Sequence, residues 1–213
     1  MSVSYHICEQ WRLALESAGL GVFDAAFDYD NHQPLSAKSH SLTYGHRLDD
    51  GTLIFIKQDR WTGWRPIARA IIRGQKPLPA VGREREKMRR LAEMGFHTAE
   101  IIAYGERRRL GLPHQAVMIT RCVPGVSLDR LHSDAAASPQ FRQEAIYQAR
   151  AVIRELQRTG CDWGRDCKPE HFFATREMRI TLIDVERMKF RRRPLDEETC
   201  RRQFARFDSL LPQ

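Results

Sequence analysis

The sequence has no long hydrophobic run. None of its apolar stretches approaches the roughly 20 residues that a membrane-spanning helix needs, although hydrophobic residues make up 42% of the chain. The segment from Met1 to Leu20 has no basic region followed by an apolar block, so a secretory signal is not expected. These absences favour a soluble globular protein over a membrane-spanning or secreted one.

Cysteine is scarce and unpatterned. The chain has five cysteines, an odd number, and no pair has the C-x-x-C spacing of a zinc or redox site. Scattered cysteines of this kind favour reduced thiols in a cytosol over a disulfide framework. The residues are Cys8, Cys122, Cys161, Cys167 and Cys200.

Acidic residues are outnumbered. The chain has 35 Lys and Arg against 27 Asp and Glu, which gives a formal net charge of +8. Such a balance suits a polyanionic partner, namely nucleic acid, an anionic membrane face or a phosphorylated glycolipid, while a solvated basic surface is the alternative. There is no zinc-finger spacing, RNA-recognition signature or pattern of stacking aromatics, so nucleic acid is not expected. Arginines cluster at Arg107–Arg109, Arg191–Arg193 and Arg201–Arg202.

The most informative stretch is residues 164–173, which read Gly-Arg-Asp-Cys-Lys-Pro-Glu-His-Phe-Phe. Asp166 and His171 keep the spacing of Asp and Asn in the kinase catalytic loop H-R-D-x-x-x-x-N, and Asp184 stands where the Asp of D-F-G is expected. Phosphoryl transfer needs one carboxylate to orient the attacking hydroxyl, and a second carboxylate with a neutral ligand to hold Mg²⁺ on the phosphates of ATP. The pattern predicts Asp166 as catalytic, with Asp184 and His171 as metal ligands.

Each of these residues also has a plain structural interpretation. Asp166 could be a turn aspartate, and a lone His such as His171 is more often a satisfied core residue than a ligand. Lys168 is placed to neutralise charge on the transferred phosphoryl group, but a surface lysine would have the same pattern. Asp184 ends an apolar run, where an aspartate usually needs a partner and Mg²⁺ is a suitable one.

A second constellation lies nearer the N-terminus. Lys57 ends the apolar strand Leu53 to Lys57, which is where a kinase carries its phosphate-binding lysine, although lysine is also common at strand ends. Glu84 shares a helical face with Met88 and Leu91, so its carboxylate is expected to face the core and to need a cation. Lys57 is the predicted partner. Glu86, on another face of the helix, is the second choice, and an ordinary surface pair is the alternative.

The order of expected elements is strands with one helix among them, then a connector, then mostly helices. We expect an α+β fold, with residues 1–213 forming a single two-lobed, protein-kinase-like domain. A small β-rich N-lobe covers about 1–121, a connector about 122–126, and a compact, truncated helical C-lobe about 127–213. Helices are expected at Tyr5–Ala18, Trp64–Arg73, Arg83–Met94, Pro139–Gln157, Leu195–Leu211 and briefly from Ser127, and strands at Leu20–Phe27, Ser41–Leu48, Thr52–Gln58, Ile101–Gly105, Gln115–Arg121 and Arg179–Ile183.

Several features depart from protein kinases. No G-x-G-x-x-G precedes the Lys57 hairpin, and the small polar stretch that includes Ser39 is the candidate for a loop that covers phosphates. Val185-Glu186 replaces Phe-Gly after Asp184, Gly164 replaces the His that opens the loop, and no Ala-Pro-Glu follows. We therefore expect neither the flipping activation segment nor the large helical lobe that bind a peptide substrate.

On these residues the chain resembles the bacterial lipopolysaccharide core kinases, which phosphorylate heptose or Kdo sugars. The resemblance runs from about Thr52 to Phe190, and a His in the Asn position of the catalytic loop, here His171, is a mark of that family. Further matching segments are Arg83-Glu84, Leu91-Ala92-Glu93-Met94-Gly95, Ile101-Ile102-Ala103-Tyr104-Gly105, Met118-Ile119-Thr120, Gly125-Val126-Ser127-Leu128, and Leu182-Ile183-Asp184 followed by Arg187.

The resemblance implies an ATP- and Mg²⁺-dependent kinase of an inner-core sugar. It also implies a cytoplasmic enzyme that contacts the anionic inner membrane face peripherally. The sites implied are Asp166 and Lys168 for catalysis, Lys57, Glu84 and Ser39 for nucleotide binding, and Asp184 and His171 for metal. The Arg191–Arg193 cluster, which follows Asp184 closely, is expected to help dock a phosphorylated glycolipid acceptor.

Other functions stay open at this stage. One alternative is a kinase-like binding protein with weak or no turnover, and another is a kinase of a different small molecule or of a protein. Joint retention of Lys57, Glu84, Asp166 and Asp184 favours the enzyme, because a binding protein is free to lose any of them. The sugar, the hydroxyl that is phosphorylated and the oligomeric state do not follow from the sequence.

Overall fold

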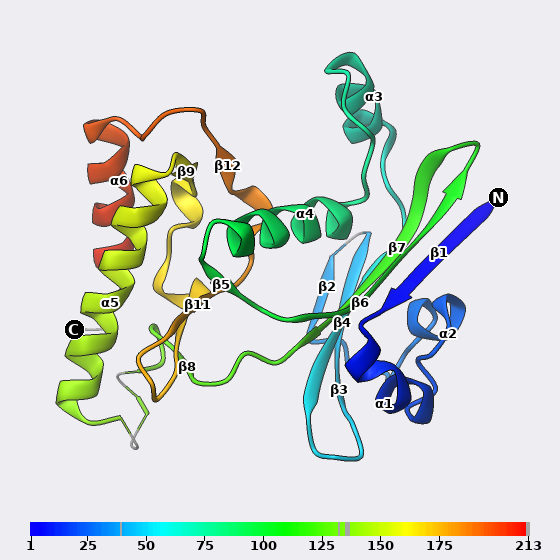
Figure 1. Ribbon diagram of the computed structural model, residues 1–213, viewed down its shortest axis with the longest axis horizontal. Coiled ribbons are helices and arrows are strands. Elements are labelled where there is room, and N and C mark those ends of the chain that lie inside the picture. The colour runs from blue at the N-terminus through cyan, green and yellow to red at the C-terminus, as the bar shows by residue number, and fades with distance from the viewer. Residues whose placement is uncertain (39, 132, 135–136, 212–213) are drawn as a thin grey trace. The chain divides into compact units, whose positions relative to one another are not determined.

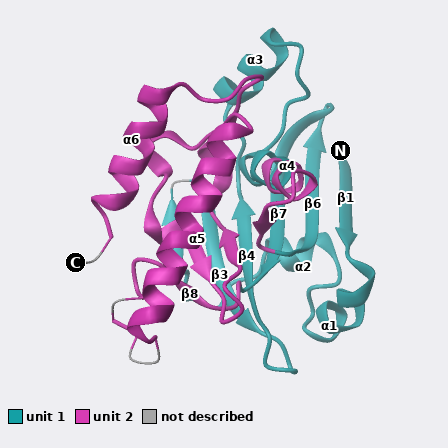
Figure 2. Ribbon diagram, turned by 60° about the vertical axis from the view of Figure 1, so that its left-hand side comes forward, with its two compact units in different colours: residues 1–86, 100–122 teal, residues 87–99, 123–213 magenta. Residues whose placement is uncertain are grey.

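The computed structural model describes residues 1–38, 40–131, 133–134 and 137–211. The chain divides into two compact units, the first formed by Met1–Glu86 and Glu100–Cys122, the second by Lys87–Ala99 and Val123–Gln213 (Figure 2). The predicted lobe boundaries stay a prediction. The second unit includes Lys87–Ala99, which the sequence analysis assigned to the N-lobe.

The first unit is built on an antiparallel sheet with the strand order β1-β6-β7-β4-β3-β2 (Figure 1). The predicted hairpin around Asp49-Asp50-Gly51 is present and joins β3 to β4, with Lys57 paired to Thr43 on one side and to Met118 on the other. The strands are β1 (Ser2–Ile7), β2 (Ser36–Lys38), β3 (Ser41–Arg47), β4 (Leu53–Asp59), β6 (Ile101–Arg109) and β7 (Leu112–Arg121). Lys57 therefore lies on a central strand of this sheet.

The first unit also contains helices, some of which pack against its sheet. They are α1 (Arg12–Ser17), preceded by the 3₁₀ turn η1 (Glu9–Trp11), then α2 (Phe23–Phe27), α3 (Trp64–Ile72) and the start of α4 (Ala80–Glu93). The core joins α1, α2 and the strands through buried apolar side chains, among them Leu15, Leu20, Phe23, Phe27, Ile54, Ile56, Ile102, Val117 and Ile119. This core fixes the sheet that carries Lys57.

The second unit combines two long helices with short strands. The helices are α5 (Pro139–Arg158) and α6 (Glu197–Asp208), and the strands are β5 (His97–Thr98), β8 (Val126–Ser127), β9 (Cys161–Asp162), β10 (Phe172–Ala174), β11 (Ile180–Leu182) and β12 (Lys189–Phe190). The 3₁₀ turns are η2 (Gly164–Asp166), η3 (Pro169–His171) and η4 (Val185–Arg187). The predicted α+β fold, β-rich in its first part and helical in its second, is confirmed.

Caps and packing hold the helices of the second unit. The Ser138 hydroxyl accepts a hydrogen bond from the backbone N–H of Phe141 at the start of α5, and the Asp196 carboxylate accepts one from Thr199 at the start of α6. Phe207 of α6 is fully buried and packs edge-on against Phe172 of β10 at 5.3 Å between ring centroids. This contact supports the strand that continues from the predicted catalytic loop.

Two predicted elements are wrong and a third is partly wrong. The predicted helix Tyr5–Ala18 is helical only in η1 and α1; its start belongs to strand β1, because the edge of β6 offers a row of backbone partners to residues 2–7. The predicted strand Leu20–Phe27 contains helix α2, in which Phe23 and Phe27 stack at 5.6 Å and both enter the core. The predicted helix at Ser127 is strand β8, which pairs with β10.

Two glycines make close approaches possible. A Cβ on Gly105 would lie 2.7 Å from both Phe23 and Tyr5, so glycine lets β1 and α2 pack against β6. Gly125 has a φ of +101°, and a Cβ there would lie 2.1 Å from the carbonyl oxygen of Ala174. Only glycine allows β8 to reach β10 in this way.

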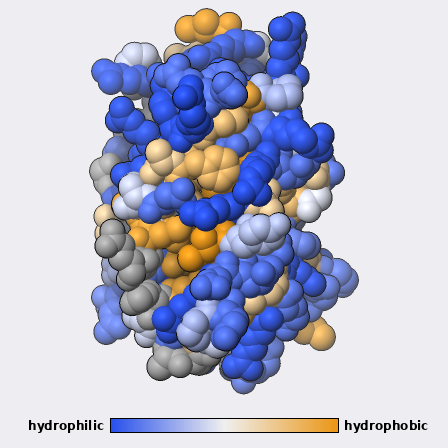
Figure 3. Space-filling view, turned by 90° about the vertical axis from the view of Figure 1, so that its left-hand side faces the viewer, coloured by the Kyte–Doolittle hydropathy of each residue, from blue (hydrophilic) through white to orange (hydrophobic). Residues whose placement is uncertain are grey.

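The surface agrees with the composition. Figure 3 shows one face of the molecule that is mostly hydrophilic, with apolar side chains visible across its middle. Among the described residues, no helix has both the length and the apolar character required to cross a bilayer.

Candidate active site

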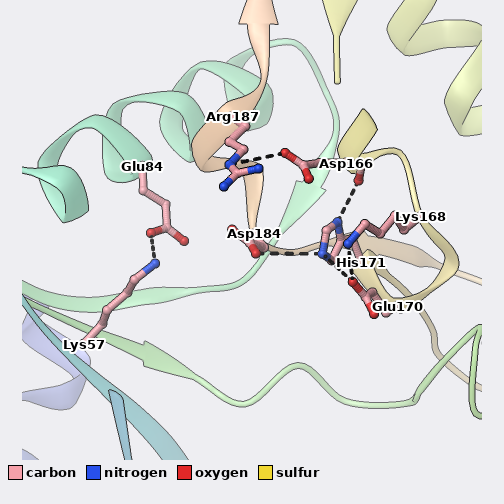
Figure 4. A network of polar contacts seen from close by, with 8 residues as sticks. All are labelled: Lys57, Glu84, Asp166, Lys168, Glu170, His171, Asp184 and Arg187. Atoms are coloured by element: carbon pink, nitrogen blue, oxygen red, sulfur yellow. Dashed lines mark hydrogen bonds and ion pairs between the residues drawn. The ribbon is translucent and has the colours of Figure 1, made fainter. Parts of the chain in front are cut away.

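One group of candidate functional residues is an ion pair between Lys57 and Glu84 within the first unit (Figure 4). The Glu84 side chain is 9% exposed and that of Lys57 is 24% exposed. Burial of a carboxylate is costly unless a cation compensates its charge, which explains the pairing. The predicted partner is therefore confirmed, while a role in nucleotide binding stays a prediction.

Glu84 points inward because it lies on the apolar face of helix α4, which packs toward the core. Met88 and Leu91, which share that face, are 5% and 0% exposed. Glu86 has a side chain that is 41% exposed and contacts Arg85 at 3.3 Å. Helical periodicity thus distinguished the two glutamates correctly.

The predicted catalytic loop is a compact structure in the second unit. Its two 3₁₀ turns are closed by backbone hydrogen bonds from Asp166 N–H to the Trp163 carbonyl at 3.1 Å and from His171 N–H to the Lys168 carbonyl at 3.0 Å. The backbone N–H of Ile183 donates to the His171 carbonyl at 3.0 Å, and β10 pairs antiparallel with β11. This pairing places His171, at the end of the loop, beside Ile183, the residue before Asp184.

His171 is buried and oriented by its surroundings. Its side chain is 9% exposed and its ring stacks on Trp163 with centroids 5.7 Å apart. Nδ1 lies 2.7 Å from the carbonyl oxygen of Asp166; because a carbonyl can only accept, Nδ1 carries a proton and donates it. Nε2, the other ring nitrogen, lies 3.8 Å from Asp184 Oδ2 (Figure 4).

Asp184 holds an unusual backbone conformation. Its φ and ψ are 51° and 50°, in the left-handed region that Asp tolerates better than most residues. Its carboxylate is 54% exposed and is not used as a helix cap. A solvent-accessible carboxylate on a strained backbone and beside an imidazole has the character of a functional group.

The Asp166 carboxylate is largely enclosed, with 18% exposure, and has a cation next to it. Arg187 Nε lies 3.6 Å from Asp166 Oδ2. Lys168, the predicted catalytic lysine, donates to Glu170 Oε1 at 3.0 Å, and the same oxygen lies 3.4 Å from His171 Nε2. The structure therefore brings Asp166, Lys168, His171 and Asp184 into one local network (Figure 4).

Two members of this network were not assigned a role from the sequence. Arg187 entered only as part of the family resemblance, and Glu170 had no assignment. The signal for Glu170 was its place between Lys168 and His171 in the loop. Ser39, predicted to cover phosphates, lies outside the described residues.

Asp184 and His171 fit a nucleotide-bound Mg²⁺ better than a resident metal. Among the described residues, no group of three or more His, Cys, Asp or Glu side chains is arranged to hold a metal ion. Mg²⁺ is commonly held by one or two carboxylates and completed by substrate phosphates and water. A ligating His usually donates its other ring N–H to a carbonyl or carboxylate, as His171 does to Asp166.

A thiol within the loop is inert. Cys167 is 1% exposed, and burial raises its pKa to about 12. The thiol is therefore neutral at physiological pH and has neither the access nor the charge of a nucleophile.

Next to the loop lies an arginine-lined cavity of about 670 Å³ in the same unit. Its floor is Asp162, whose carboxylate accepts from Gly164 N–H, from Gln203 Nε2 and from Arg191, at 3.0, 3.0 and 2.9 Å. Gly164 has a φ of +58°, which favours glycine at the position where kinases have His. We define the arginine cavity by its cationic lining residues, Arg165, Arg191, Arg202 and Arg206.

Comparison with known proteins places these observations in a family. Residues 39–207 match the model of the "Lipopolysaccharide kinase (Kdo/WaaP) family". The lipopolysaccharide core heptose(I) kinase WaaP of Pseudomonas aeruginosa is 25% identical over 195 residues, which cover 84% of this chain and 72% of that protein.

Further similarity comes from a second organism and from a solved structure. A protein of the same name from Escherichia coli is 26% identical over 154 residues, and the match covers 67% of this chain but only 58% of that protein, less than two thirds of its length. A solved structure described as WaaP in complex with acyl carrier protein has a TM-score of 0.62 at 22% identity, covering 98% of this chain and 80% of that one. That likeness confirms the fold.

The family match covers most of the chain, including Lys57, Glu84 and the whole network around His171. The sequence prediction of a phosphotransferase with an alcohol acceptor is thereby confirmed at the level of the family. The chain belongs to the lipopolysaccharide kinase (Kdo/WaaP) family.

Proposed function

We propose that this protein transfers the γ-phosphoryl group of ATP to a hydroxyl of a heptose or Kdo sugar in the inner core of lipopolysaccharide. The observation that carries the proposal is the network of Asp166, His171 and Asp184 in the second unit. One enclosed carboxylate for the acceptor and one exposed carboxylate beside an imidazole for the metal match the two requirements of phosphoryl transfer.

Asp166 is proposed to act on the acceptor. Its carboxylate accepts the proton as the sugar oxygen attacks the γ-phosphorus; the new P–O bond forms while the bond to the β,γ-bridging oxygen breaks and ADP leaves. Arg187 Nε, 3.6 Å from Asp166 Oδ2, is proposed to orient this carboxylate between turnovers. Lys168 is proposed to neutralise charge on the phosphoryl group in transfer, moving from its ground-state contact with Glu170.

The remaining residues are proposed to act on the nucleotide. The Lys57 ammonium, oriented by Glu84, binds phosphate oxygens. Asp184 and His171 would hold Mg²⁺, which when bound neutralises and orients the phosphates. The hydrogen bond from His171 Nδ1 to the Asp166 carbonyl keeps Nε2 available for this task.

The charge of the second unit supports an anionic acceptor. In the arginine cavity, Arg191 is paired with Asp162, and no ion pair is found for Arg165 or Arg206 in the part of the chain that the structure describes. Planar guanidinium groups bind phosphate and carboxylate oxygens in two-pronged fashion. We infer that these arginines bind acidic groups of a glycolipid acceptor, and that the protein acts in the cytoplasm at the anionic face of the membrane.

The direct test is phosphoryl transfer to defined acceptors. The protein is incubated with ATP and Mg²⁺ and with intact lipopolysaccharide, its delipidated core oligosaccharide, or oligosaccharides that end in heptose or in Kdo. Mass spectrometry locates the added phosphate. Transfer to one sugar, lost in Asp166→Asn, supports the proposal and names the sugar. ATP binding without transfer to any of these acceptors would favour a kinase-like binding protein or a kinase of another substrate.

A further inference from the structure

Helix α3 (Trp64–Ile72) is a strongly amphipathic helix with no fully buried side chain. Its apolar residues recur with helical periodicity at Trp64, Ile67, Ala68, Ile71 and Ile72, which places them on one stripe. None of its residues is buried. A helix of a globular protein normally packs such a stripe against the core, whereas on α3 Ile67 and Ala68 are only half-buried and the rest of the stripe is exposed.

The exposure falls on the largest apolar side chains of the stripe. Trp64 is 67% exposed, Ile71 56% and Ile72 84%, and Trp61, just before the helix, is 46% exposed. In Figures 1 and 2, α3 stands away from the sheet of its own unit. Clustered aromatic and branched side chains in water mark an interaction surface, unlike a single exposed leucine.

The segments before and after α3 are anchored to the first unit by hydrogen bonds. The backbone N–H groups of Arg60 and Thr62 donate to the carbonyls of His40 and His114, at 2.8 and 3.2 Å. After the helix, Ala80 N–H donates to the Asp59 carboxylate at 2.6 Å. The stripe is therefore presented on both sides by chain that is anchored to the first unit.

The positive charge around α3 indicates which kind of partner this surface can bind. No acidic residue occurs anywhere between Arg60 and Arg83. Arg65, Arg69 and Arg73 follow one another at four-residue spacing, so they form a cationic stripe beside the apolar one. The surface thus combines apolar insertion with attraction to anions.

We propose that α3 is an interfacial helix that lies in the surface of an anionic phospholipid bilayer. The apolar stripe enters the boundary between headgroups and acyl chains, tryptophan occupies the interface that it prefers, and the arginines contact lipid phosphates. With nine residues, α3 is too short to span the hydrocarbon core. This proposal adds a membrane-binding element to the proposed function. It rests on the proposed function only for the identity of the membrane, because binding of α3 to a bilayer needs neither ATP nor an acceptor.

The test uses the full chain with vesicles of phosphatidylethanolamine and phosphatidylglycerol. Co-sedimentation gives the partition coefficient, and tryptophan fluorescence reports insertion, since Trp61 and Trp64 are exposed at α3 while Trp11 is half-buried and Trp163 is buried. The expected results are binding, a blue-shifted emission, and quenching by brominated lipids. Binding should weaken with added salt and be much weaker to phosphatidylcholine vesicles, because the arginines need anionic headgroups.

Variants locate the surface. Ile71→Ser/Ile72→Ser should weaken partitioning by about 100-fold and abolish the blue shift, because two inserted side chains are lost. Leu13→Ser is the matched control, since Leu13 is 78% exposed on α1 and should leave binding unchanged. Arg65→Gln/Arg69→Gln/Arg73→Gln should remove the preference for anionic vesicles while the apolar stripe remains.

Several outcomes would overturn the proposal. These are an absence of wild-type binding at low salt, equal binding by the isoleucine variant, or equal binding to neutral vesicles. Concentration-dependent self-association without vesicle binding, abolished by the isoleucine variant, would assign the stripe to a second copy of the chain. If no acceptor were ever phosphorylated, vesicle binding would still stand, so failure of the proposed function is distinguishable from failure of this one.

Discussion

His171 donates its Nδ1 proton to the backbone carbonyl oxygen of Asp166 across 2.7 Å. One hydrogen bond therefore links the proposed metal ligand to the proposed catalytic residue, while the other ring nitrogen, Nε2, lies 3.8 Å from Asp184 Oδ2. A change at the metal side should consequently disturb the catalytic carboxylate as well.

Loss of the metal ligands should raise the Mg²⁺ requirement. Asp184→Ala is expected to weaken Mg²⁺-dependent ATP binding strongly, because it removes a charged oxygen ligand from a hard cation. His171→Ala should have a similar but smaller effect, since a neutral nitrogen contributes less. Calorimetric titration of ATP at a series of Mg²⁺ concentrations measures both. An unchanged Mg²⁺ dependence in Asp184→Ala would count against the metal role.

Asp166→Asn should separate catalysis from nucleotide binding. The substitution keeps the shape of the side chain and removes its capacity to accept a proton, so kcat should fall by about 100-fold to 10,000-fold. ATP affinity should stay close to that of the wild type, because Asp166 is assigned to the acceptor. Steady-state assays on the identified sugar give kcat, and nucleotide titration gives the affinity. Near wild-type turnover in this variant would refute the assignment.

Lys57→Ala and Glu84→Ala should not be additive. The two side chains form one ion pair, so removal of either disables the same phosphate contact. Each single variant should lower kcat/KM by about 100-fold, and the double variant should lose little more. A Glu86→Ala variant serves as the control, since Glu86 contacts Arg85 on another face of α4. Additive losses would remove Glu84 from the nucleotide site.

Arginines of the second unit should set affinity for an acidic acceptor. Arg165→Gln/Arg206→Gln is expected to raise the KM for phosphorylated oligosaccharide by about tenfold, without changing the KM for ATP. Arg201→Gln is the control, because Arg201 is exposed on α6 outside the arginine cavity. The difference between the two variants should shrink with added salt. If the two variants behave alike at low salt, the cavity is only a solvated basic surface.

Arg191 is unsuitable for that test. It pairs with the buried Asp162 at 2.9 Å, so its loss would leave a carboxylate uncompensated and destabilise the loop. The sequence analysis treated Arg191–Arg193 as one docking cluster. The structure distinguishes Arg191, which has this internal partner, from Arg192 and Arg193, which are exposed at the rim of a neighbouring hollow.

Thiol reactivity should follow burial. Iodoacetamide is expected to modify Cys8, which is exposed, in the native protein, and to reach Cys167 only after unfolding. Burial raises the pKa of Cys167 from its ordinary 9.0 to about 12, so the unfolded thiol ionises first. The native state should lose stability as pH rises through that interval. Mass spectrometry of alkylated peptides, with and without denaturant, checks the first point, and early modification of Cys167 would contradict it.

Local sequence alone determined several elements of this protein. The alternating strands around Asp49-Asp50-Gly51 specify the β3–β4 hairpin, because turn and strand preferences act between near neighbours. The apolar periodicity of α4 distinguished Glu84 from Glu86 for the same reason. The spacing of Asp166, His171 and Asp184 identified the candidate residues, since a catalytic loop requires particular residue types at particular separations.

Only the tertiary structure decided the rest, because those outcomes depend on partners distant in the chain. Residues 2–7 became a strand through pairing with β6, and Ser127 through pairing with β10. Arg187 and Arg191 received their carboxylate partners from the loop that follows α5. The stripe on α3 predicts a helix but not its exposure, because exposure depends on whether any other part of the fold packs against it.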